Sequence, residues 1–325
     1  QYDLQLTVFD RVQEVGAGWV RIPIRWREIE TKEGEYNWDR LDRTVHAATS
    51  RNLQILLTFM DVPYWSSGVS NNCQMWADKN CNTPPASPDH MTHFAEAVAR
   101  RYLGIVKNYE TWNEPDIGVF WSDPNAAPGR GTPGSPDELI RLIILPVRTA
   151  IKKVDPSARV IAPGFARPSD KTTMANYIYK GKFEAFNGHT YDNFAQIESK
   201  LKEWKNIYSQ SATVARKPLA KFWLTEVGID AYKLPGRNLQ EKLQAQASQI
   251  QQMLDMLSGG RSESCYISGI GQDCDFANWV ERAFIYRTED NVEGISRGIV
   301  TVPDYAPKPS FCAVLDYIAG NETGL

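Results

Sequence analysis

Short apolar runs rich in β-branched residues alternate along the chain with longer segments in which apolar positions recur every three to four residues. The short runs are typical of buried strands, and the longer spacing is typical of helices that pack one face against a sheet. Their regular alternation predicts repeated β-α units with parallel strands. Seven strands are predicted, over residues 19–24, 53–59, 105–112, 158–162, 185–189, 221–227 and 280–286.

Capping residues mark where the intervening helices begin and end. Ser87 and Ser135 each precede a proline, and Glu138 completes a capping box with Ser135. A hydroxyl before a first-turn proline is typical of a helix N-terminus. The segment 238–257 carries apolar residues on one stripe and is followed by Gly259, which predicts a core-facing helix with a glycine stop.

The repeated units predict an α/β fold, a (β/α)8 TIM barrel formed by a single domain over residues 1–325. The chain opens, however, on an amphipathic helix with Leu4, Val8 and Val12 on one face. The first barrel strand is therefore apparently missing. We expect it to lie outside this sequence, because an unfilled gap would leave two strand edges unpaired. A barrel that closes with seven strands, or another segment in the gap, are the alternatives.

Charge and hydropathy exclude two classes of partner. The formal net charge is -3, and both signs are mixed along the chain. A nucleic-acid-binding surface concentrates Lys and Arg in one patch or stripe, so we expect no nucleic-acid partner. No apolar run approaches the roughly 20 residues of a membrane span, so we expect no membrane partner either.

Four of the five cysteines form two close pairs in polar, loop-like stretches, Cys73 with Cys81 and Cys265 with Cys274. Neither spacing matches a zinc-binding pattern, so we predict two disulfides and no metal. Disulfides indicate an oxidising compartment, so we expect the protein to be secreted, to the periplasm or the extracellular space. Cys312 falls on an apolar helical stripe and is predicted to be a buried thiol.

Two glutamates stand where parallel barrels carry their chemistry, at the carboxyl ends of strands. Glu114 follows the predicted strand 105–112, and Glu226 lies inside the otherwise apolar strand 221–227, where a charge must be paired or functional. Retaining cleavage of a glycosidic bond needs one carboxylic acid and one carboxylate about 5 to 5.5 Å apart. Strand ends that face each other across a barrel mouth can supply that spacing. Taken singly, the ordinary interpretations are a loop carboxylate and a salt-bridged strand carboxylate.

Arg21 alternates with apolar residues in the predicted strand 19–24. We expect its side chain to supply the cation that keeps Glu226 ionised. An ordinary buried ion pair is the alternative, and the two interpretations can describe the same contact.

The Asn113-Glu114-Pro115 motif and the Thr225-Glu226 pair resemble clan A of the glycoside hydrolases, with family thirty-nine the most similar. The resemblance covers residues 3–318. It implies a retaining hydrolase with Glu114 as the acid/base, Glu226 as the nucleophile and Asn113 as the donor to the sugar 2-hydroxyl. Further matching features are Gly18-Trp19-Val20-Arg21, His189, Tyr191, Tyr286-Arg287 and Lys308-Pro309-Ser310-Phe311.

Three of these matching residues are expected near the sugar. His189 is either a subsite residue or a satisfied core histidine, and Tyr191 is a candidate donor to the Glu226 carboxylate. Tyr286 stands where many clan members have a tryptophan, so the resemblance implies weaker or differently aimed stacking there.

Aromatic loop residues are candidate platforms for sugars, whose apolar faces stack on rings. Trp65 and Trp76 follow the predicted strand 53–59, and Trp121 follows 105–112. Several such rings favour a β-linked oligosaccharide or polysaccharide of plant type as the substrate. Endo action and an exo-acting β-xylosidase both stay open, and a non-catalytic glycan-binding barrel is the alternative from another class. No cofactor is implied, because the reaction needs only an acid, a nucleophile and water.

Overall fold

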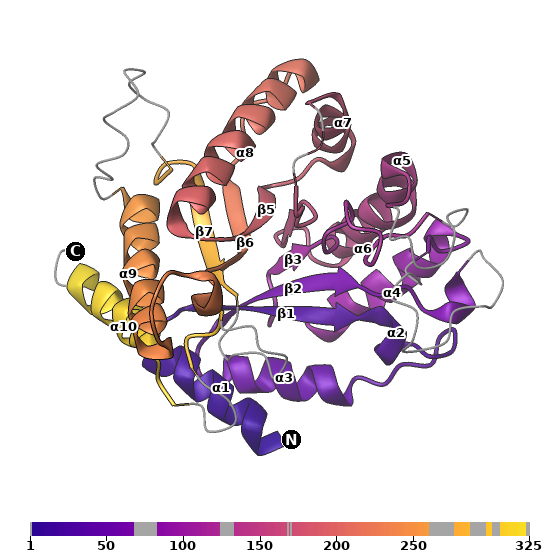
Figure 1. Ribbon diagram of the computed structural model, residues 1–325. Helices are drawn as coiled ribbons and strands as arrows, with labels where there is room; N and C mark the ends of the chain where they lie inside the picture. Colours follow the sequence, from indigo (N-terminus) through magenta and orange to yellow (C-terminus); the bar gives the residue numbers. More distant parts are fainter. Residues whose placement is uncertain are drawn as a thin grey trace.

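The computed structural model describes residues 2–67, 83–123, 133–167, 169, 171–259, 276–286, 297–300 and 306–322. Within them, parallel strands stand in the middle and helices surround them (Figure 1). All seven predicted strands are found, with boundaries that differ by a few residues at most. They are β1 (Trp19–Arg25), β2 (Gln54–Met60), β3 (Asn108–Glu110), β4 (Arg159–Ile161), β5 (Phe186–Tyr191), β6 (Phe222–Gly228) and β7 (Val280–Ile285).

The helices begin at the predicted caps. The Ser87 hydroxyl accepts from the Asp89 N–H, and the Ser135 hydroxyl accepts from the Glu138 N–H, which satisfies amides that a helix start leaves unpaired. The longer helices are α1 (Tyr2–Glu14), α3 (Asp39–Thr49), α4 (Pro88–Arg101), α6 (Leu145–Val154), α7 (Lys171–Gly181), α8 (Phe194–Ala215), α9 (Leu239–Ser258) and α10 (Pro309–Glu322). Short segments are α2 (Trp26–Ile29), η1 (Tyr64–Ser66), α5 (Pro136–Leu139), the π-helix η2 (Ile140–Ile144) and η3 (Ala231–Lys233).

The strands form two parallel sheets that follow each other around the barrel. One contains β1, β2, β3 and β4 in this order, and the other contains β5, β6 and β7. Where they meet, the Ala162 N–H donates to the Ala185 carbonyl, and the His189 N–H donates to the Phe165 carbonyl. The bridge between Phe165 and Gly188 is also parallel. The carboxyl ends of all seven strands therefore point toward one end of the barrel.

β1 and β7 lie next to each other without a hydrogen-bonded ladder. In the described part of the chain, β1 pairs only with β2, and β7 pairs only with β6. Trp19 of β1 packs edge-on against Trp223 and Phe284, with ring centroids 5.5 and 6.3 Å away. The described residues thus form the predicted TIM barrel with seven of its eight strands, and side chains span the seam.

The barrel interior carries charge at its amino end and an apolar layer above it. Arg159 of β4 and Glu281 of β7 form a bidentate ion pair, with N to O distances of 3.0 and 2.8 Å. The Trp223 indole N–H also donates to Glu281. We call Arg159 and Glu281 the lower ion pair. The apolar layer consists of Leu56, Ile161, Ala185, Trp223 and Phe284.

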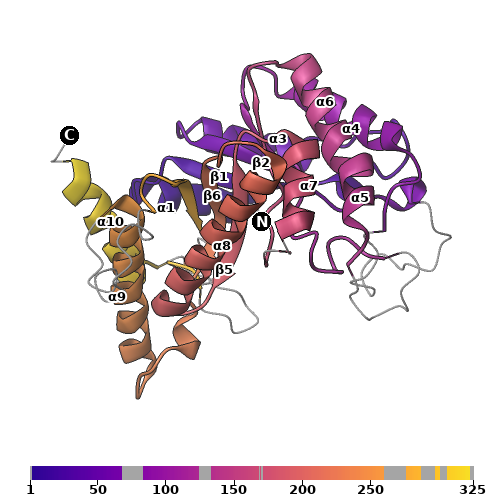
Figure 2. The same ribbon diagram turned by 90° about the horizontal axis from the view of Figure 1, so that it is seen from above.

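Helices α1 and α10 lie on the same side of the barrel in both views (Figure 2). Gly16, which follows α1, has a φ of 80° and packs so closely on Ile318 of α10 that a Cβ would lie 3.0 Å from its Cγ2. The two ends of the described chain therefore support each other. None of the described helices is long and apolar enough to cross a bilayer.

Candidate active site

Polar side chains gather at the carboxyl ends of the strands, at the opposite end from the lower ion pair. Arg21 comes from β1, Glu110 from β3, Glu114 from the loop after β3, and Glu226 from β6. We call these four residues the upper cluster. They are up to 205 positions apart in sequence and are brought together by the parallel order of the strands. This end of the barrel is where such folds carry their chemistry.

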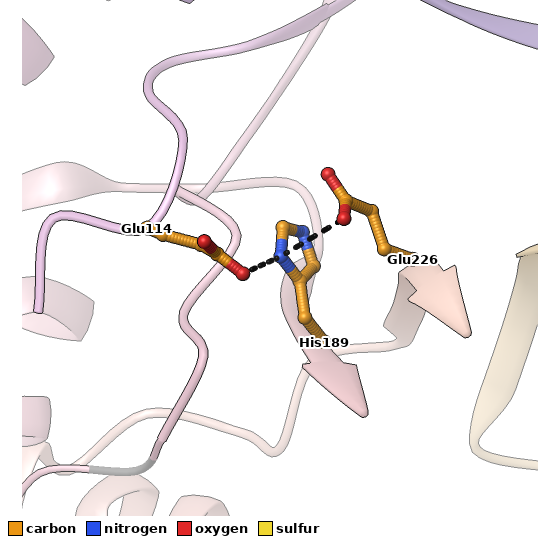
Figure 3. Close-up of side chains that lie close together, drawn as sticks. All are labelled: Glu114, His189 and Glu226. Atoms are coloured by element: carbon orange, nitrogen blue, oxygen red, sulfur yellow. Dashed lines mark hydrogen bonds and ion pairs between the residues drawn. The ribbon is translucent and has the colours of Figure 1, made fainter. Parts of the chain in front are cut away.

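The carboxyl groups of Glu114 and Glu226 face each other across His189 (Figure 3). One oxygen of each and one ring nitrogen of His189 all lie within 4.8 Å of one another. The His189 Nδ1 atom is 2.7 Å from Glu114 Oε1 and 3.8 Å from Glu226 Oε2. Retaining glycosidases place their carboxyl groups about 5 to 5.5 Å apart, and inverting enzymes about 6.5 to 9.5 Å apart. The spacing therefore fits double displacement.

Glu114 sits on a strained backbone that its loop holds in place. Its φ is 39°, in the left-handed region that residues with a Cβ rarely adopt. The Glu114 N–H donates to the Gly164 carbonyl at 2.6 Å. Nearby, the Asp116 carboxylate accepts from the N–H groups of Ala166 and Arg167. Burial raises the pKa of Asp116, while these two hydrogen bonds oppose the rise. Strain of this kind persists only where the surroundings fix the chain.

Arg21 links three acceptors with its three nitrogens. It donates to Glu226 at 2.5 Å, to Glu110 at 2.6 Å and to the amide oxygen of Asn113 at 2.7 Å. Burial alone would lower the pKa of Arg21, but the charges of Glu110 and Glu226 outweigh it and raise the pKa. The predicted cation thus lies beside Glu226, and the contact is at the same time a buried ion pair. Because Arg21 engages the Asn113 oxygen, the amide N–H groups of Asn113 are the ones that can serve a ligand.

Glu110 belongs to this site although sequence analysis did not single it out. Its side chain is fully buried and accepts hydrogen bonds from residues of four different strands. The donors are Arg21 of β1, Thr58 of β2, Asn187 of β5 and Thr225 of β6. The available signal was an acidic residue inside a buried strand, which is the same signal that identifies Glu226.

His189 is also fully enclosed, with 1% of its surface exposed. Its second ring nitrogen, Nε2, lies 3.0 Å from the Thr225 hydroxyl. Gly164 is needed beside it, since a Cβ at this position would lie 2.3 Å from Nε2 and 2.7 Å from Glu110 Oε1. His189 therefore contacts Glu114 while being satisfied in the core, so the two interpretations of this residue merge.

Glu114, His189 and Glu226 are also the type of residues that can hold a metal ion, at suitable mutual distances. Two contacts oppose this. Arg21 already compensates the charge of Glu226, and His189 Nδ1 is engaged by Glu114. A cation would have to displace both contacts and stand next to a guanidinium. The donor set therefore suits proton transfer better than metal binding.

Residues 2–257 match the sequence model of the cellulase family, glycosyl hydrolase family 5. The match takes in more than half of the chain. The chain belongs to glycosyl hydrolase family 5. The predicted resemblance to clan A is thereby confirmed, since family 5 lies in that clan.

Several known proteins are similar to this family 5 chain. A β-xylosidase of Geobacillus stearothermophilus is 27% identical in an alignment of 157 residues that covers 45% of this chain and 28% of that protein. A family 39 glycoside hydrolase of Bacteroides cellulosilyticus WH2 has a TM-score of 0.64 at 17% identity and covers 98% of this chain and 61% of its own. A family 39 β-xylosidase of Caulobacter crescentus has a TM-score of 0.69 at 15% identity, covering 98% and 68%. The chain thus spans about a quarter of the first relative and about two thirds of the structures, which share its barrel fold.

The aromatic residues of the family 5 barrel divide into packed and peripheral rings. Trp121 is fully buried, packs edge-on against Trp112 and donates to the Ser135 carbonyl. The prediction that Trp121 offers a stacking face is therefore wrong in this structure. Trp65 is half-buried and donates to the Glu30 carbonyl, so much of its ring serves packing. Trp76 lies outside the described residues.

Tyr191 and Tyr286 lie together at the rim. Their rings meet edge-on at 5.2 Å, and the Arg297 guanidinium lies 4.5 Å from the Tyr191 ring centre. No hydrogen bond joins the Tyr191 hydroxyl to Glu226 among the described residues, so that predicted donor is replaced by Arg21.

The cysteine predictions have mixed outcomes. Cys73, Cys81, Cys265 and Cys274 all lie outside the described residues, so the two disulfides stay predictions. Cys312 is exposed on α10, and the expectation of a buried thiol is wrong. The neighbouring Phe311 takes the buried position of that turn.

A cavity of about 380 Å³ adjoins the site on the His189 side, between the end of β5 and the first turns of α8. This volume is within the range of small-ligand pockets. Its walls offer polar and apolar surface in similar amounts and include the side chains of His189, Tyr191, Asp192, Gln196, Lys200 and Glu203.

Proposed function

We propose that this family 5 chain is a retaining β-glycosidase, in which Glu226 is the nucleophile and Glu114 is the acid/base. The observation that carries the proposal is the cluster of Glu114, His189 and Glu226, whose contacting atoms lie within 4.8 Å of one another. The spacing leaves room for one sugar carbon between the carboxyl groups and not for an additional water.

The reaction would run in two balanced steps. In the first, the Glu226 carboxylate attacks the anomeric carbon while Glu114 gives its proton to the glycosidic oxygen. The bond between carbon and that oxygen breaks, the alcohol leaves, and a glycosyl ester on Glu226 remains. In the second, water attacks the same carbon, Glu114 takes the water proton, and Glu226 leaves as a carboxylate.

The contacts of the upper cluster suit these roles. Arg21 lies 2.5 Å from Glu226 and stabilises its charge before attack and after departure. Asn113 is held by Arg21 next to the reacting carbon, where its amide can donate to the sugar 2-hydroxyl. Both carboxyl side chains are about one-tenth exposed, so each can reach a ligand from an otherwise dry site.

For the substrate we propose a β-linked oligosaccharide, with the leaving sugar in the cavity between β5 and α8. This cavity borders His189, which contacts the acid/base Glu114, and the leaving group departs on the side of the acid. Carboxylate, amide and hydroxyl groups in its wall are suited to sugar hydroxyls. An exo-acting β-xylosidase is the second candidate, favoured by two similar proteins that carry this name.

Azide rescue of two matched variants tests the proposal. On an activated aryl β-glycoside, Glu226→Ala should lose on the order of 10⁵-fold in kcat. Added azide should then restore turnover and give the inverted glycosyl azide, because it attacks the substrate directly. Glu114→Ala keeps the nucleophile, so azide should attack the ester on Glu226 and give the retained product.

Two outcomes would overturn this assignment. A retained azide product from Glu226→Ala would show that another group is the nucleophile. A wild-type protein that binds oligosaccharides but hydrolyses none of a panel of aryl β-glycosides would favour a glycan-binding barrel. Products from defined xylo- and cello-oligosaccharides would separate endo action from exo-xylosidase action.

A further inference from the structure

A continuous chain of contacts leads from the buried Glu110 to the acid/base Glu114. The Thr225 hydroxyl donates to Glu110 Oε1 at 3.1 Å and lies 3.0 Å from His189 Nε2. His189 Nδ1 in turn lies 2.7 Å from Glu114 Oε1. Glu110, Thr225 and His189 are each at most 1% exposed, so protein groups and not bulk water determine their hydrogen bonds.

The direction of this chain follows from Glu110. Its carboxylate is paired with Arg21 and also receives an N–H from the amide nitrogen of Asn187, and the contacting nitrogens of both partners can only donate. A threonine hydroxyl has one hydrogen, and here it is given to Glu110. Toward His189, Thr225 can therefore present only a lone pair. The hydrogen between Thr225 and Nε2 must come from the imidazole.

The other side of the ring is then fixed as well. A neutral imidazole carries one hydrogen, so a ring with Nε2–H has a lone pair on Nδ1. A hydrogen bond of 2.7 Å between this nitrogen and Glu114 requires a hydrogen from the carboxyl group. Moving that hydrogen to Nδ1 would create an imidazolium and an ionised Glu114, which are two additional charges in a buried site, and burial favours the neutral pair.

We propose that Thr225, oriented by Glu110, is a positioning residue that keeps His189 in the Nε2–H form and so leaves the proton on Glu114, ready for the leaving group. This inference rests on the proposed function of Glu114. The same arrangement serves the second step. Once Glu114 has given up its proton, its carboxylate faces a lone pair on Nδ1, and this repulsion favours recovery of a proton from the attacking water.

Two buried threonines form a matched pair for the test. Thr58 and Thr225 are each 1% exposed and both donate to Glu110, but only Thr225 contacts His189. The variants Thr225→Val and Thr58→Val each remove one donor to Glu110 and keep the side-chain shape. Only the first also removes the acceptor for Nε2.

The readout is the dependence of kcat/KM on the leaving group. A dinitrophenyl β-glycoside departs without a proton, whereas an alkyl β-glycoside needs acid help. For Thr225→Val we expect a loss of about 10²-fold on the alkyl substrate, within the range for general acid catalysis, and a few-fold change at most on the dinitrophenyl substrate. Thr58→Val should change both rates by the same small factor.

The pH profile gives an independent signature. Without Thr225, the imidazole can turn its hydrogen to Nδ1 and donate to ionised Glu114, so the alkaline limb of kcat/KM on the alkyl substrate should move to lower pH. Among the described residues, the other charged groups around Glu114 are Glu226, Arg21, Glu110 and Asp116, and all four are retained in both threonine variants. The same shift in Thr58→Val would point to Glu110 alone and overturn the role of Thr225.

The outcomes separate this inference from the proposed function. If wild type does not hydrolyse the dinitrophenyl substrate, the proposed function fails. If wild type is active and Thr225→Val loses kcat/KM equally on both substrates, or on neither of them, only the role of Thr225 fails. Nitrogen NMR of wild-type His189 provides a measurement that needs no variant. We expect the His189 ring to carry a hydrogen on Nε2 and none on Nδ1. A ring with its hydrogen on Nδ1 alone would overturn the inference.

Discussion

The lower ion pair and the upper cluster both join distant strands through one arginine, but only the lower one is balanced in charge. Below, one arginine meets one glutamate in a bidentate pair whose side chains are 34% and 26% exposed. Above, one guanidinium faces three carboxyl groups that are 0% to 12% exposed. In a dry site with more carboxyl groups than cations, simultaneous ionisation of all the carboxyl groups is disfavoured. That excess is what an acid catalyst requires.

The pKa of Glu281 illustrates the balanced case. Its hydrogen bonds with Arg159 lower the pKa to about 2, against the opposing effect of burial. This carboxyl group is therefore ionised at any ordinary pH and cannot serve as an acid. In the upper cluster, Arg21 is shared between Glu110 and Glu226, and none of its nitrogens donates to Glu114. The lower ion pair and the upper cluster thus use the same residue types for different purposes. One glutamate for each arginine suits a stabilising pair, and several glutamates around one arginine suit chemistry.

The largest effect is expected from removing the shared cation with Arg21→Met. Glu110 would stay fully buried without compensation, so we expect a loss of about 3–5 kcal/mol in the free energy of unfolding. The loss of the cation beside Glu226 should lower kcat/KM on the order of 10³-fold. Denaturant unfolding and aryl glycoside turnover measure the two effects.

The double variant Arg21→Met with Glu110→Gln sharpens this prediction. It removes the uncompensated charge, so part of the stability should return while the activity stays low. Recovery of activity together with stability would mean that Arg21 acts only through folding.

A smaller and purely structural effect is expected from Arg159→Met in the lower pair. The pair is partly hydrated, so the variant should lose about 1 kcal/mol in the free energy of unfolding, with unchanged kcat/KM. The pKa of Glu281 is lower in the folded state than in the unfolded state. The stabilisation of the fold by this pair should therefore be complete above about pH 4.5 and disappear as the pH falls toward 2. Unfolding curves of wild type and variant should therefore converge at acidic pH. A difference that persists at pH 2, or a loss of turnover, would contradict this separation of roles.

The smallest effect is expected from metal removal. In the upper cluster, Arg21 already pairs with Glu110 and Glu226, and His189 engages Glu114, so dialysis against a chelator should leave turnover of an aryl β-glycoside unchanged. A fall in activity that added zinc reverses would contradict this prediction. Glu114, His189 and Glu226 would then be candidate ligands of a metal ion.

Local signals in the sequence were sufficient for the barrel and for the central carboxyl pair. Glu114 and Glu226 could be selected because each combines an acidic residue with a strand end, and Arg21 because it interrupts an apolar strand. Each of these signals lies within a few residues. The parallel order of strands then brings the residues to one end without further information.

Features that depend on contacts between distant segments were missed. Glu110 carries the same signal as Glu226, but its importance comes from donors on four strands. The direction of the Thr225 hydroxyl depends on Glu110 in the same way. Trp121 was misjudged for a related reason. The sequence of a loop does not show whether a tryptophan ring faces solvent or, as here, packs against another ring such as Trp112.

The backbone of Glu114 has a consequence for how such a protein can change. With a φ of 39°, position 114 is one that glycine would occupy with less strain than any residue that carries a Cβ. Substitution by glycine would thus relax the fold and remove the proposed acid/base in the same event. A library of variants at position 114 that is screened only for thermal resistance would therefore select inactive proteins. A screen that is meant to retain the activity must also measure turnover.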